Sequence, residues 1–342
     1  MCELRQQKMQ EWLATLTSYS FDLSTVSAAS SDASFRRYFR VAETGTGKTH
    51  VVMDAPPDKE DVKPFLHVAH ALKVAGLNAP DILASNLQDG FLLLTDFGNT
   101  TFLQALGQGA SSESMYRRAM SDLVHMQTRT SVAGLPLYAA EKLLSEMALF
   151  EQWFIQAHHR AELTTQEKNW LAGIQNLLVQ SALAESQVFV HRDYHSRNLM
   201  LLPGTEQTPE LGIIDFQDAV AGPLSYDLVS LLRDAYIQWP EEQTLDWTIR
   251  YWEEARKAGL KVPADIGEFY RQFDFMGLQR HLKVLGIFAR LNHRDGKAQY
   301  LNDLPLVLEY VRKVAARYIA FKPLLLILDR LEDKAVQVAY SF

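Results

Sequence analysis

The pattern of apolar residues changes near residue 97, and this change most constrains how the chain folds. Short runs rich in aromatic and β-branched residues lie at 35–41, 50–53, 81–86 and 90–95. With the helical repeat over 61–75, they predict a small antiparallel sheet with a helix against it. After residue 97 nearly every segment has helical spacing. We therefore expect an α+β fold with two lobes, an N-terminal lobe over 1–96 and a mostly helical C-terminal lobe over 97–342.

Composition narrows the class of protein. The 34 Lys and Arg residues against 41 Asp and Glu residues give a net charge of −7, which argues against broad attraction to nucleic acid or anionic lipid. The single cysteine, Cys2, allows no disulfide framework. No apolar run approaches the roughly 18 residues of a membrane span, and the first residues are mixed in charge. We expect a cytoplasmic protein that binds neither nucleic acid nor membrane.

Residues 42–49, AETGTGKT, nearly match the phosphate-binding loop pattern G-x-x-x-x-G-K-[ST], but Ala42 stands where the first glycine belongs. That loop works only when a helix N-terminus follows it, because backbone amides there hold the phosphate. Here the next residues are the strand-like 50–53 and then Pro56 and Pro57. We interpret the segment as a polar hairpin turn with a solvated Lys48.

Residues 188–201, VFVHRDYHSRNLML, form an apolar strand, a polar loop and a second apolar strand. The loop has the spacing H-x-D-x-x-x-x-N, with Asp193 and Asn198 at the acidic and amide positions. In kinases the Asp lies within hydrogen-bond reach of the acceptor hydroxyl, and the Asn holds a metal bound to the nucleotide phosphates. Taken alone, Asp and Asn also suit ordinary loop capping.

A second segment supports the kinase interpretation. Residues 211–218, LGIIDFQD, are an apolar strand that delivers Asp215 at its end, with Asp-Phe-Gln where protein kinases have Asp-Phe-Gly. A carboxylate there can hold Mg²⁺ against the β- and γ-phosphates of a nucleotide. Two such loops in one chain, each following a strand, predict an ATP- and Mg²⁺-dependent phosphotransferase.

The motifs HRDYHSRN and IIDFQDA resemble those of the aminoglycoside phosphotransferase and choline kinase group, which has a bilobal, protein-kinase-like fold. Within it, the segments SSDASFRRYFRV, VVMDAPPDKED, LLLTDFG and FDFMGLQRHLKVLGIFARL resemble the bacterial anomeric sugar kinases that phosphorylate N-acetylmuramic acid and N-acetylglucosamine for cell-wall recycling. The resemblance covers essentially the whole chain. It implies ATP-dependent phosphorylation of the anomeric hydroxyl of an amino sugar.

The resemblance also implies roles for single residues. Asp193 corresponds to the catalytic base, and Asn198 and Asp215 correspond to metal ligands. His191 and Asp227 correspond to residues that brace the catalytic loop. Asp218 has two interpretations, a position near a second metal or a structural bond to the adjacent loop.

On the nucleotide side, LLLTDFG resembles the segment that joins the lobes, which places adenine against backbone groups near Thr95 and Phe97. Residues 30–34, with Ser31 and Asp32, stand in place of the glycine-rich loop. The lysine that kinases carry on the third strand is absent, since His50-Val-Val-Met-Asp54 contains none. Either another cation or an additional Mg²⁺ held partly by Asp54 takes over. Strand alternation favours Arg36 as that phosphate contact, with a solvated surface arginine as the alternative.

For the acceptor, Arg280 is a candidate for a forked contact with the lactyl carboxylate of N-acetylmuramic acid, or else it pairs with a neighbouring acid. Two other functions compete with the amino sugar kinase. One is a kinase for choline, an amino alcohol or an aminoglycoside. The other is a weakly active nucleotide-binding regulator, which the missing strand lysine alone supports.

Overall fold

The computed structural model describes residues 2–30 and 35–332. The chain forms two compact units. The first contains residues up to 114 together with 197–218, and the second contains 115–196 together with 219 onward. The units are not contiguous in sequence, so this division does not test the predicted lobe boundary at residue 97, which stays a prediction.

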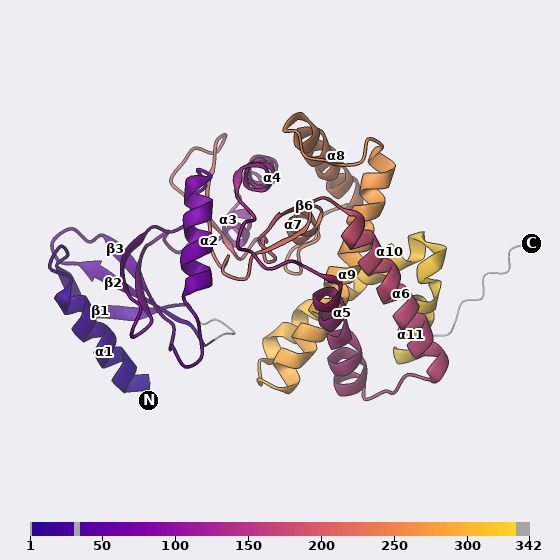
Figure 1. Ribbon diagram of the computed structural model, residues 1–342, viewed down its shortest axis with the longest axis horizontal. Coiled ribbons are helices and arrows are strands. Elements are labelled where there is room, and N and C mark those ends of the chain that lie inside the picture. Colours follow the sequence, from indigo (N-terminus) through magenta and orange to yellow (C-terminus); the bar gives the residue numbers. More distant parts are fainter. Residues whose placement is uncertain (1, 31–34, 333–342) are drawn as a thin grey trace, which may run out of the picture. The chain divides into compact units, whose positions relative to one another are not determined.

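The first unit is built on a five-stranded antiparallel sheet with the strand order β1-β2-β3-β5-β4. Its elements are α1 (Cys2–Thr15), β1 (Phe21–Ser30), β2 (Arg37–Glu43), β3 (Thr49–Asp54), α2 (Lys63–Val74), β4 (Ile82–Asn86), β5 (Phe91–Thr95), α3 (Phe102–Gly107), β7 (Leu199–Leu202) and β8 (Glu210–Ile213). Figure 1 shows α1 lying along the strands β1, β2 and β3.

One face of this sheet is covered by α1. Met9 and Leu13 of the helix are buried against Val41, Val52 and Phe91 of three neighbouring strands. Complete burial of each such side chain stabilises the fold by about 1.5–3 kcal/mol. Because side chains alternate along a strand, the residues on either side of Val41 and Val52 point to the opposite face of the sheet.

The hairpin of β7 and β8 belongs to the same unit. Leu199 pairs with Ile213 at its base. The backbone of β8 passes close to the ring of Phe97, and a Cβ atom added at Gly212 would lie 2.5 Å from Cδ2 of that ring. Only glycine permits this approach, so Gly212 fixes how closely the segment after β5 packs on the hairpin.

The second unit is mostly helical. Its elements are α4 (Ser112–Arg129), whose first turn lies in the first unit, α5 (Ala140–Leu149), the π-helix η1 (Phe150–His158), α6 (Thr165–Ala184), β6 (Gln187–Val190), β9 (Val220–Pro223), α7 (Tyr226–Leu232), α8 (Glu241–Lys257), α9 (Ile266–His293), the 3₁₀-helix η2 (Ala298–Asp303), α10 (Leu304–Arg317), the 3₁₀-helix η3 (Ile319–Phe321) and α11 (Lys322–Leu331). Strands β6 and β9 pair in antiparallel fashion.

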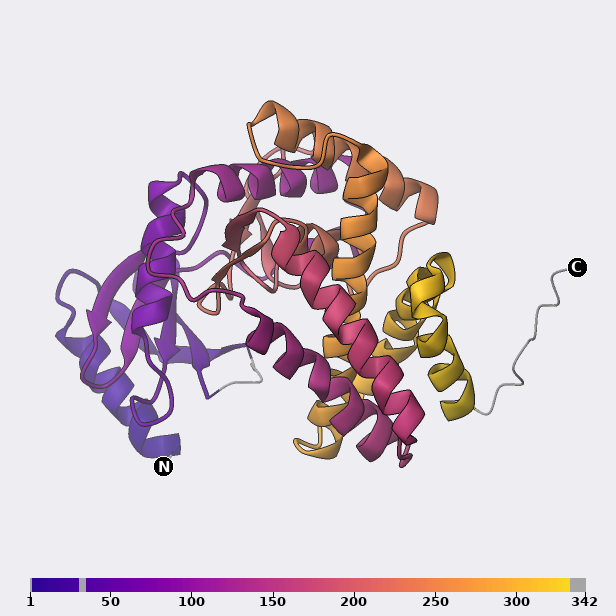
Figure 2. The same ribbon diagram turned by 45° about the vertical axis from the view of Figure 1, so that its right-hand side comes forward.

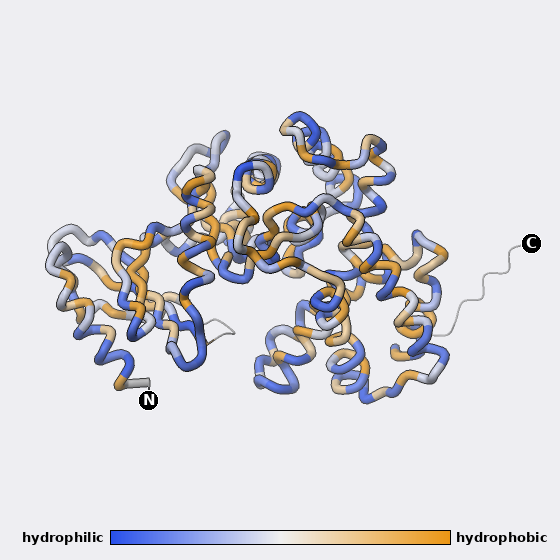
Figure 3. Tube along the Cα trace, viewed as in Figure 1, coloured by the Kyte–Doolittle hydropathy of each residue, from blue (hydrophilic) through white to orange (hydrophobic). Residues whose placement is uncertain are grey.

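Helix α9 runs through the centre of this unit, and α5, α6, α7 and α10 pack around it, as Figure 2 shows for the helix pairs in view. Gly286 allows the closest approach, because a Cβ atom there would lie 2.4 Å from the carbonyl carbon of Leu149. Figure 3 shows hydrophobic and hydrophilic residues alternating along these helices, as expected where one face of each is buried. Among the helices described, none is long and apolar enough to cross a bilayer.

Candidate active site

The loop after β6 carries Asp193 in the second unit, and a buried carboxylate shapes this loop. Asp227, in the first turn of α7, accepts hydrogen bonds from the backbone N–H groups of His191 at 2.7 Å and Arg192 at 3.0 Å. The Nδ1 atom of His191 accepts a bond from the Asp193 N–H at 3.3 Å. His191 and Asp227 are both fully buried. The loop is therefore held by hydrogen bonds to His191 and Asp227, the two residues expected to brace it.

Two positions in the candidate site adopt a left-handed backbone that non-glycine residues rarely take. Arg192 has a φ of 79° and Asp215 has a φ of 64°. Such a conformation costs about 1–3 kcal/mol and persists where surrounding contacts enforce it. The Arg192 guanidinium contacts the Glu146 carboxylate and lies 5.5 Å from the Tyr138 ring centre. Strain of this kind gathers at functional sites.

The Asp193 side chain is 43% exposed, which leaves its carboxylate accessible to a substrate. Partial burial alone would raise the pKa of Asp193, but the positive groups Lys283, His195, Arg280 and Arg192 outweigh it and lower the pKa to about 2. Asp193 is therefore ionised at neutral pH and is able to accept a hydrogen bond from a hydroxyl group.

The hairpin β7–β8 brings Asn198 and Asp215 together within the first unit. The Ile214 N–H donates to the Asn198 carbonyl at 3.1 Å, and the Asn198 side-chain amide donates to Asp215 Oδ2 at 3.2 Å. Gln217 donates to Asp215 Oδ1 at 2.8 Å. These contacts place a carboxylate and an amide side by side at the end of one hairpin.

Comparisons with known proteins agree with this geometry. Residues 25–260 match the model of the phosphotransferase enzyme family. The chain belongs to this family. The chain is also 44% identical, over 99% of both sequences, to the N-acetylmuramate/N-acetylglucosamine kinase of Neisseria meningitidis serogroup B. The resemblance inferred from the sequence is thus confirmed, and the protein is a phosphotransferase.

Solved structures confirm the predicted fold class. An ADP-bound aminoglycoside phosphotransferase superposes with a TM-score of 0.57 at 15% identity, covering 90% of this chain and 98% of that one. The choline kinase of Streptococcus pneumoniae gives a TM-score of 0.56 at 12% identity, covering 80% of this chain and 89% of the other. At such low identity these likenesses establish the fold alone.

The structure places Arg36, the predicted phosphate contact, between two acids of the first unit. Its Nη1 lies 3.9 Å from Glu60 Oε2, and its Nη2 lies 3.9 Å from Asp218 Oδ2. Protein kinases pair the strand lysine with a glutamate of the neighbouring helix. Glu60 precedes α2 closely and gives Arg36 a comparable partner. The interpretation of Arg36 as a solvated arginine is wrong, because its side chain is largely buried.

Asp54 has a different environment from the one considered for a metal ligand. Its buried carboxylate is paired on Oδ1 with Arg5 of α1 and on Oδ2 with Arg37 of β2. Arg5 also donates to the Asp89 carbonyl at 2.7 Å. Since both oxygens already bind guanidinium groups, Asp54 joins α1 to the sheet, and the structure gives no support to a second Mg²⁺ held there.

The remaining predicted nucleotide contacts lie near β5. The N–H of Thr95 donates to the Asp81 carbonyl at 3.0 Å, so a contact from Thr95 to a base would use its carbonyl or side chain. Phe97 packs its ring on Gly212. Asp96, the residue between Thr95 and Phe97, accepts hydrogen bonds from Arg40 Nε at 2.5 Å and Arg40 Nη2 at 2.9 Å. These bonds fix the segment against β2. Ser31 and Asp32 lie outside the described residues.

Sequence reasoning missed several polar partners in both half-sites. They are Glu60 and Gln217 in the first unit and Glu146 and Arg192 in the second. Gln217, two residues after Asp215, and Arg192, directly before Asp193, lie within the predicted motifs, so their positions offered a signal. Glu60 and Glu146 come from segments distant in sequence from the motifs, and a single sequence does not show which distant residues meet.

Proposed function

We infer that the protein is an N-acetylmuramate/N-acetylglucosamine kinase, which transfers the γ-phosphoryl group of ATP to the anomeric hydroxyl and forms the sugar 1-phosphate. The observation that carries the proposal is the 44% identity to the Neisseria relative across 99% of both chains. In this role the enzyme acts in the cytoplasm and returns amino sugars to cell-wall precursors.

Asp193 accepts the hydrogen bond of the anomeric hydroxyl and takes its proton. The low pKa of Asp193 makes it a weak base, so it orients the hydroxyl early and receives the proton late. A loose phosphoryl-transfer transition state suits this order, because positioning contributes more to it than base strength. Asp227 and His191 hold the loop in place for this contact.

The residues at the end of the hairpin fit Mg²⁺. Asp215 and Asn198 provide hard oxygen atoms, and Mg²⁺ at phosphate sites uses one or two carboxylates with substrate phosphates and water. The Oε1 atom of Gln217 is buried without a hydrogen-bond partner in the described part of the chain, which suits a ligated water molecule. When bound, the ion neutralises charge on the β- and γ-phosphates. Asp215 and Asn198 would hold it, with Gln217 orienting Asp215.

ATP binds through the first unit in this proposal. Arg36 takes the place of the strand lysine at the phosphates, and Glu60 and Asp218 hold its guanidinium group in position. Residues Ser31 and Asp32 belong to the loop over the phosphates. Thr95 and Phe97 border the adenine. We retain the assignment of 1–96 as the nucleotide-binding lobe and 97–342 as the catalytic and substrate-binding lobe.

The charges around Asp193 favour a neutral or anionic acceptor over a cationic one. Arg192, Arg280 and Lys283 are all close enough to Asp193 to lower its pKa, and the last two are buried. A choline, amino alcohol or aminoglycoside would bring a further positive charge toward this cluster. We therefore prefer the amino sugar, with Arg280 among the groups that contact it.

The test is to incubate the protein with ATP, Mg²⁺ and a panel of amino sugars, amino alcohols and aminoglycosides, and to locate the new phosphate by ³¹P NMR. Phosphate at C1 of N-acetylmuramic acid or N-acetylglucosamine is the expected product. Phosphate on a non-anomeric hydroxyl, or on choline or an aminoglycoside alone, would reject the proposal.

A further inference from the structure

A buried network of charged residues lies beside Asp193 in the second unit, and Glu146 of α5 is at its centre. The Glu146 carboxylate contacts the Arg192 guanidinium and the Tyr138 hydroxyl, and its Oε2 lies 3.4 Å from Lys283 Nζ. Burial alone would raise the pKa of Glu146, but Lys283 and Arg192 lower it, so the carboxylate is ionised. Lys283 also donates to the Tyr226 hydroxyl at 3.1 Å. Glu146 and Tyr226 thus satisfy Lys283.

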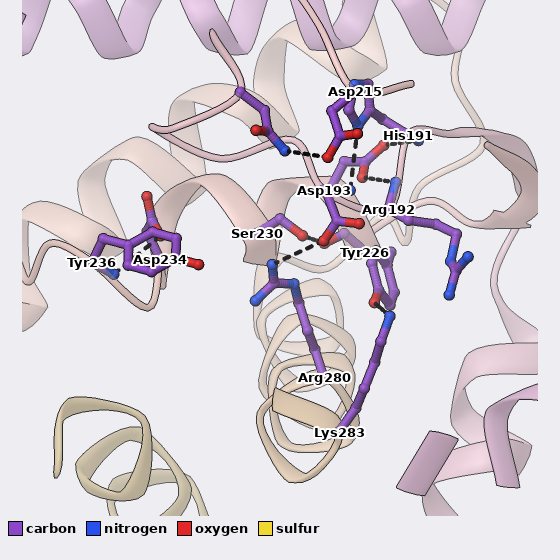
Figure 4. Close-up of polar contacts among 12 residues, drawn as sticks. His191, Arg192, Asp193, Asp215, Tyr226, Ser230, Asp234, Tyr236, Arg280 and Lys283 are labelled. Atoms are coloured by element: carbon purple, nitrogen blue, oxygen red, sulfur yellow. Dashed lines mark hydrogen bonds and ion pairs between the residues drawn. The ribbon is translucent and has the colours of Figure 1, made fainter. Parts of the chain in front are cut away.

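Arg280 lies one helical turn before Lys283 and is satisfied much less completely. Figure 4 shows both side chains extending from α9, Lys283 toward Tyr226 and Arg280 toward Asp193. The Arg280 Nη2 atom is 4.0 Å from Asp193 Oδ1, beyond hydrogen-bond distance. Arg280 is 3% exposed, and its Nε and Nη1 atoms are buried with no hydrogen-bond partner in the described residues. A buried cation with unused donors is costly unless a ligand binds them.

Several positive groups of the network lie close to Asp193. Arg192, Lys283 and Arg280 are positive, and their ion pairs in the described residues include those with the carboxylates of Glu146 and Asp193. Lys142, 3.8 Å from Glu146, adds positive charge. Arg280 has two buried donor nitrogens without a hydrogen-bond partner in the described residues, so it is the cation of this network that we consider for a ligand.

Asp227 does not bind the unused donors of Arg280 in the described residues. Burial raises the pKa of Asp227 to about 7, against hydrogen bonds from two backbone N–H groups that lower it. It is therefore only partly ionised at neutral pH, and both of its oxygens already accept bonds from the loop.

We propose that Arg280 is a specificity-determining residue that binds a carboxylate on the acceptor sugar through its two terminal nitrogens, Nη1 and Nη2, and so favours N-acetylmuramate over N-acetylglucosamine. This inference rests on the proposed function, since it concerns the choice between the two sugars. The two acceptors differ by the lactyl ether, whose carboxylate supplies one negative charge and two acceptor oxygens. A guanidinium group matches that planar anion in a forked contact.

The alternative anionic ligand for Arg280 is the transferred phosphoryl group. The two roles differ in an observable way. A residue that neutralises the phosphoryl group affects both sugars equally, because both receive the same group. A residue that binds the lactyl carboxylate affects N-acetylmuramate alone.

The experiment measures kcat/KM for both sugars with the wild-type protein and with Arg280→Gln and Arg280→Lys. Arg271→Gln is the matched control, because Arg271 lies on the same helix and is exposed. For Arg280→Gln we expect kcat/KM for N-acetylmuramate to fall by about 10- to 100-fold, the range for a lost charge-assisted hydrogen bond. The value for N-acetylglucosamine should change by less than about threefold, since Asp193 stays ionised without Arg280. Arg280→Lys keeps the charge and should give an intermediate loss.

A substrate modification tests the same contact without altering the protein. The methyl ester of N-acetylmuramic acid has no charge on the lactyl group, and wild-type protein should use it less well than the acid. Arg280→Gln should use the acid and the ester about equally. A wild-type protein that phosphorylates neither sugar would reject the proposed function itself. Activity on both sugars with an unchanged preference in Arg280→Gln would overturn only the role of Arg280.

Discussion

Replacement of Asp193 by Asn tests the chemical role of the catalytic loop most directly. The amide has nearly the same shape as the carboxylate and still accepts a hydrogen bond, but it cannot take a proton. General base catalysis contributes about 10²- to 10⁴-fold, and most when the pKa of the base lies near the working pH. Because Asp193 has a pKa of about 2, we expect kcat to fall in the lower half of that range, by about 10²- to 10³-fold.

The assay follows ADP release at saturating ATP and sugar, while isothermal titration measures ATP binding to each protein. ATP affinity should stay close to the wild-type value, because the proposed nucleotide contacts lie in the first unit. The control is Asp246→Asn, whose side chain is 47% exposed and so comparable to Asp193, and which pairs with Arg250 one helical turn away. It should leave kcat unchanged.

The pH dependence gives a second measurement on the same residue. With a pKa of about 2, Asp193 does not change its charge between pH 5 and pH 8, so it should produce no acidic limb of kcat/KM there. Near-normal turnover of Asp193→Asn would refute the assignment of the base. An acidic limb near pH 6 that disappears in this variant would show instead that the surrounding cations do not lower the pKa as inferred.

Three further changes test other parts of the structure. Arg36→Ala should raise the KM for ATP by about tenfold, with Arg36→Lys recovering part of the loss, whereas unchanged kinetics would disprove its phosphate contact. Gly212→Ala should lower the free energy of unfolding in urea by about 1–3 kcal/mol, because the new methyl group meets the Phe97 ring; no measurable change would contradict that packing. Glu185 is buried and has a pKa raised to about 7, so its contribution to stability is complete below about pH 4.3 and is lost as the pH rises to 7. Glu185→Gln should therefore reduce the fall in unfolding free energy between pH 5 and pH 7, and equal slopes in the two proteins would count against the burial argument.

Most of the sheet was predictable because its signals are local. The predicted strands and helix of the first unit match β2, β3, α2, β4 and β5 to within a few residues. The segment 42–49 is a hairpin turn, as expected, in which Gly45 and Gly47 have φ values of 83° and 67° and Lys48 is exposed. Glycine adopts these conformations at no steric cost, so the turn can be predicted from the local sequence.

Other elements exist only through tertiary contacts. Strand β1 was missed because FDLSTVSAAS has a weak strand pattern, and its pairing with β2 contains two register irregularities. Strand β9 was missed because Gly222 and Pro223 argue against a strand, yet it pairs with β6. The region 150–158 has helical spacing, but the spacing did not reveal that it is a π-helix. In each case the partner segment decides the conformation.

The candidate site also contains residues that local sequence signals reveal and residues that only tertiary contacts reveal. Asp193, Asn198 and Asp215 lie in short motifs, because the chemistry requires fixed backbone spacing between a strand end and a polar side chain. Their partners do not share that requirement. Glu146 needs only to bring a carboxylate to Arg192 and Lys283, and α5 and α9 deliver it by packing. Many sequences satisfy such a contact, so no pattern in one chain identifies it.

The contrast between motif residues and packing partners also explains why the chain can lack the strand lysine. A kinase requires a cation at the nucleotide phosphates, but the requirement is for charge at a place in space rather than for a residue at a place in the sequence. Here the strand ends in Asp54, which faces α1 and pairs with Arg5 and Arg37, so the strand position serves packing. Arg36 lies on the other face, between Glu60 and Asp218. If Arg36 binds the phosphates as proposed, Glu60 is its partner in place of the helix glutamate, and the cation comes from the residue before β2 instead of from β3.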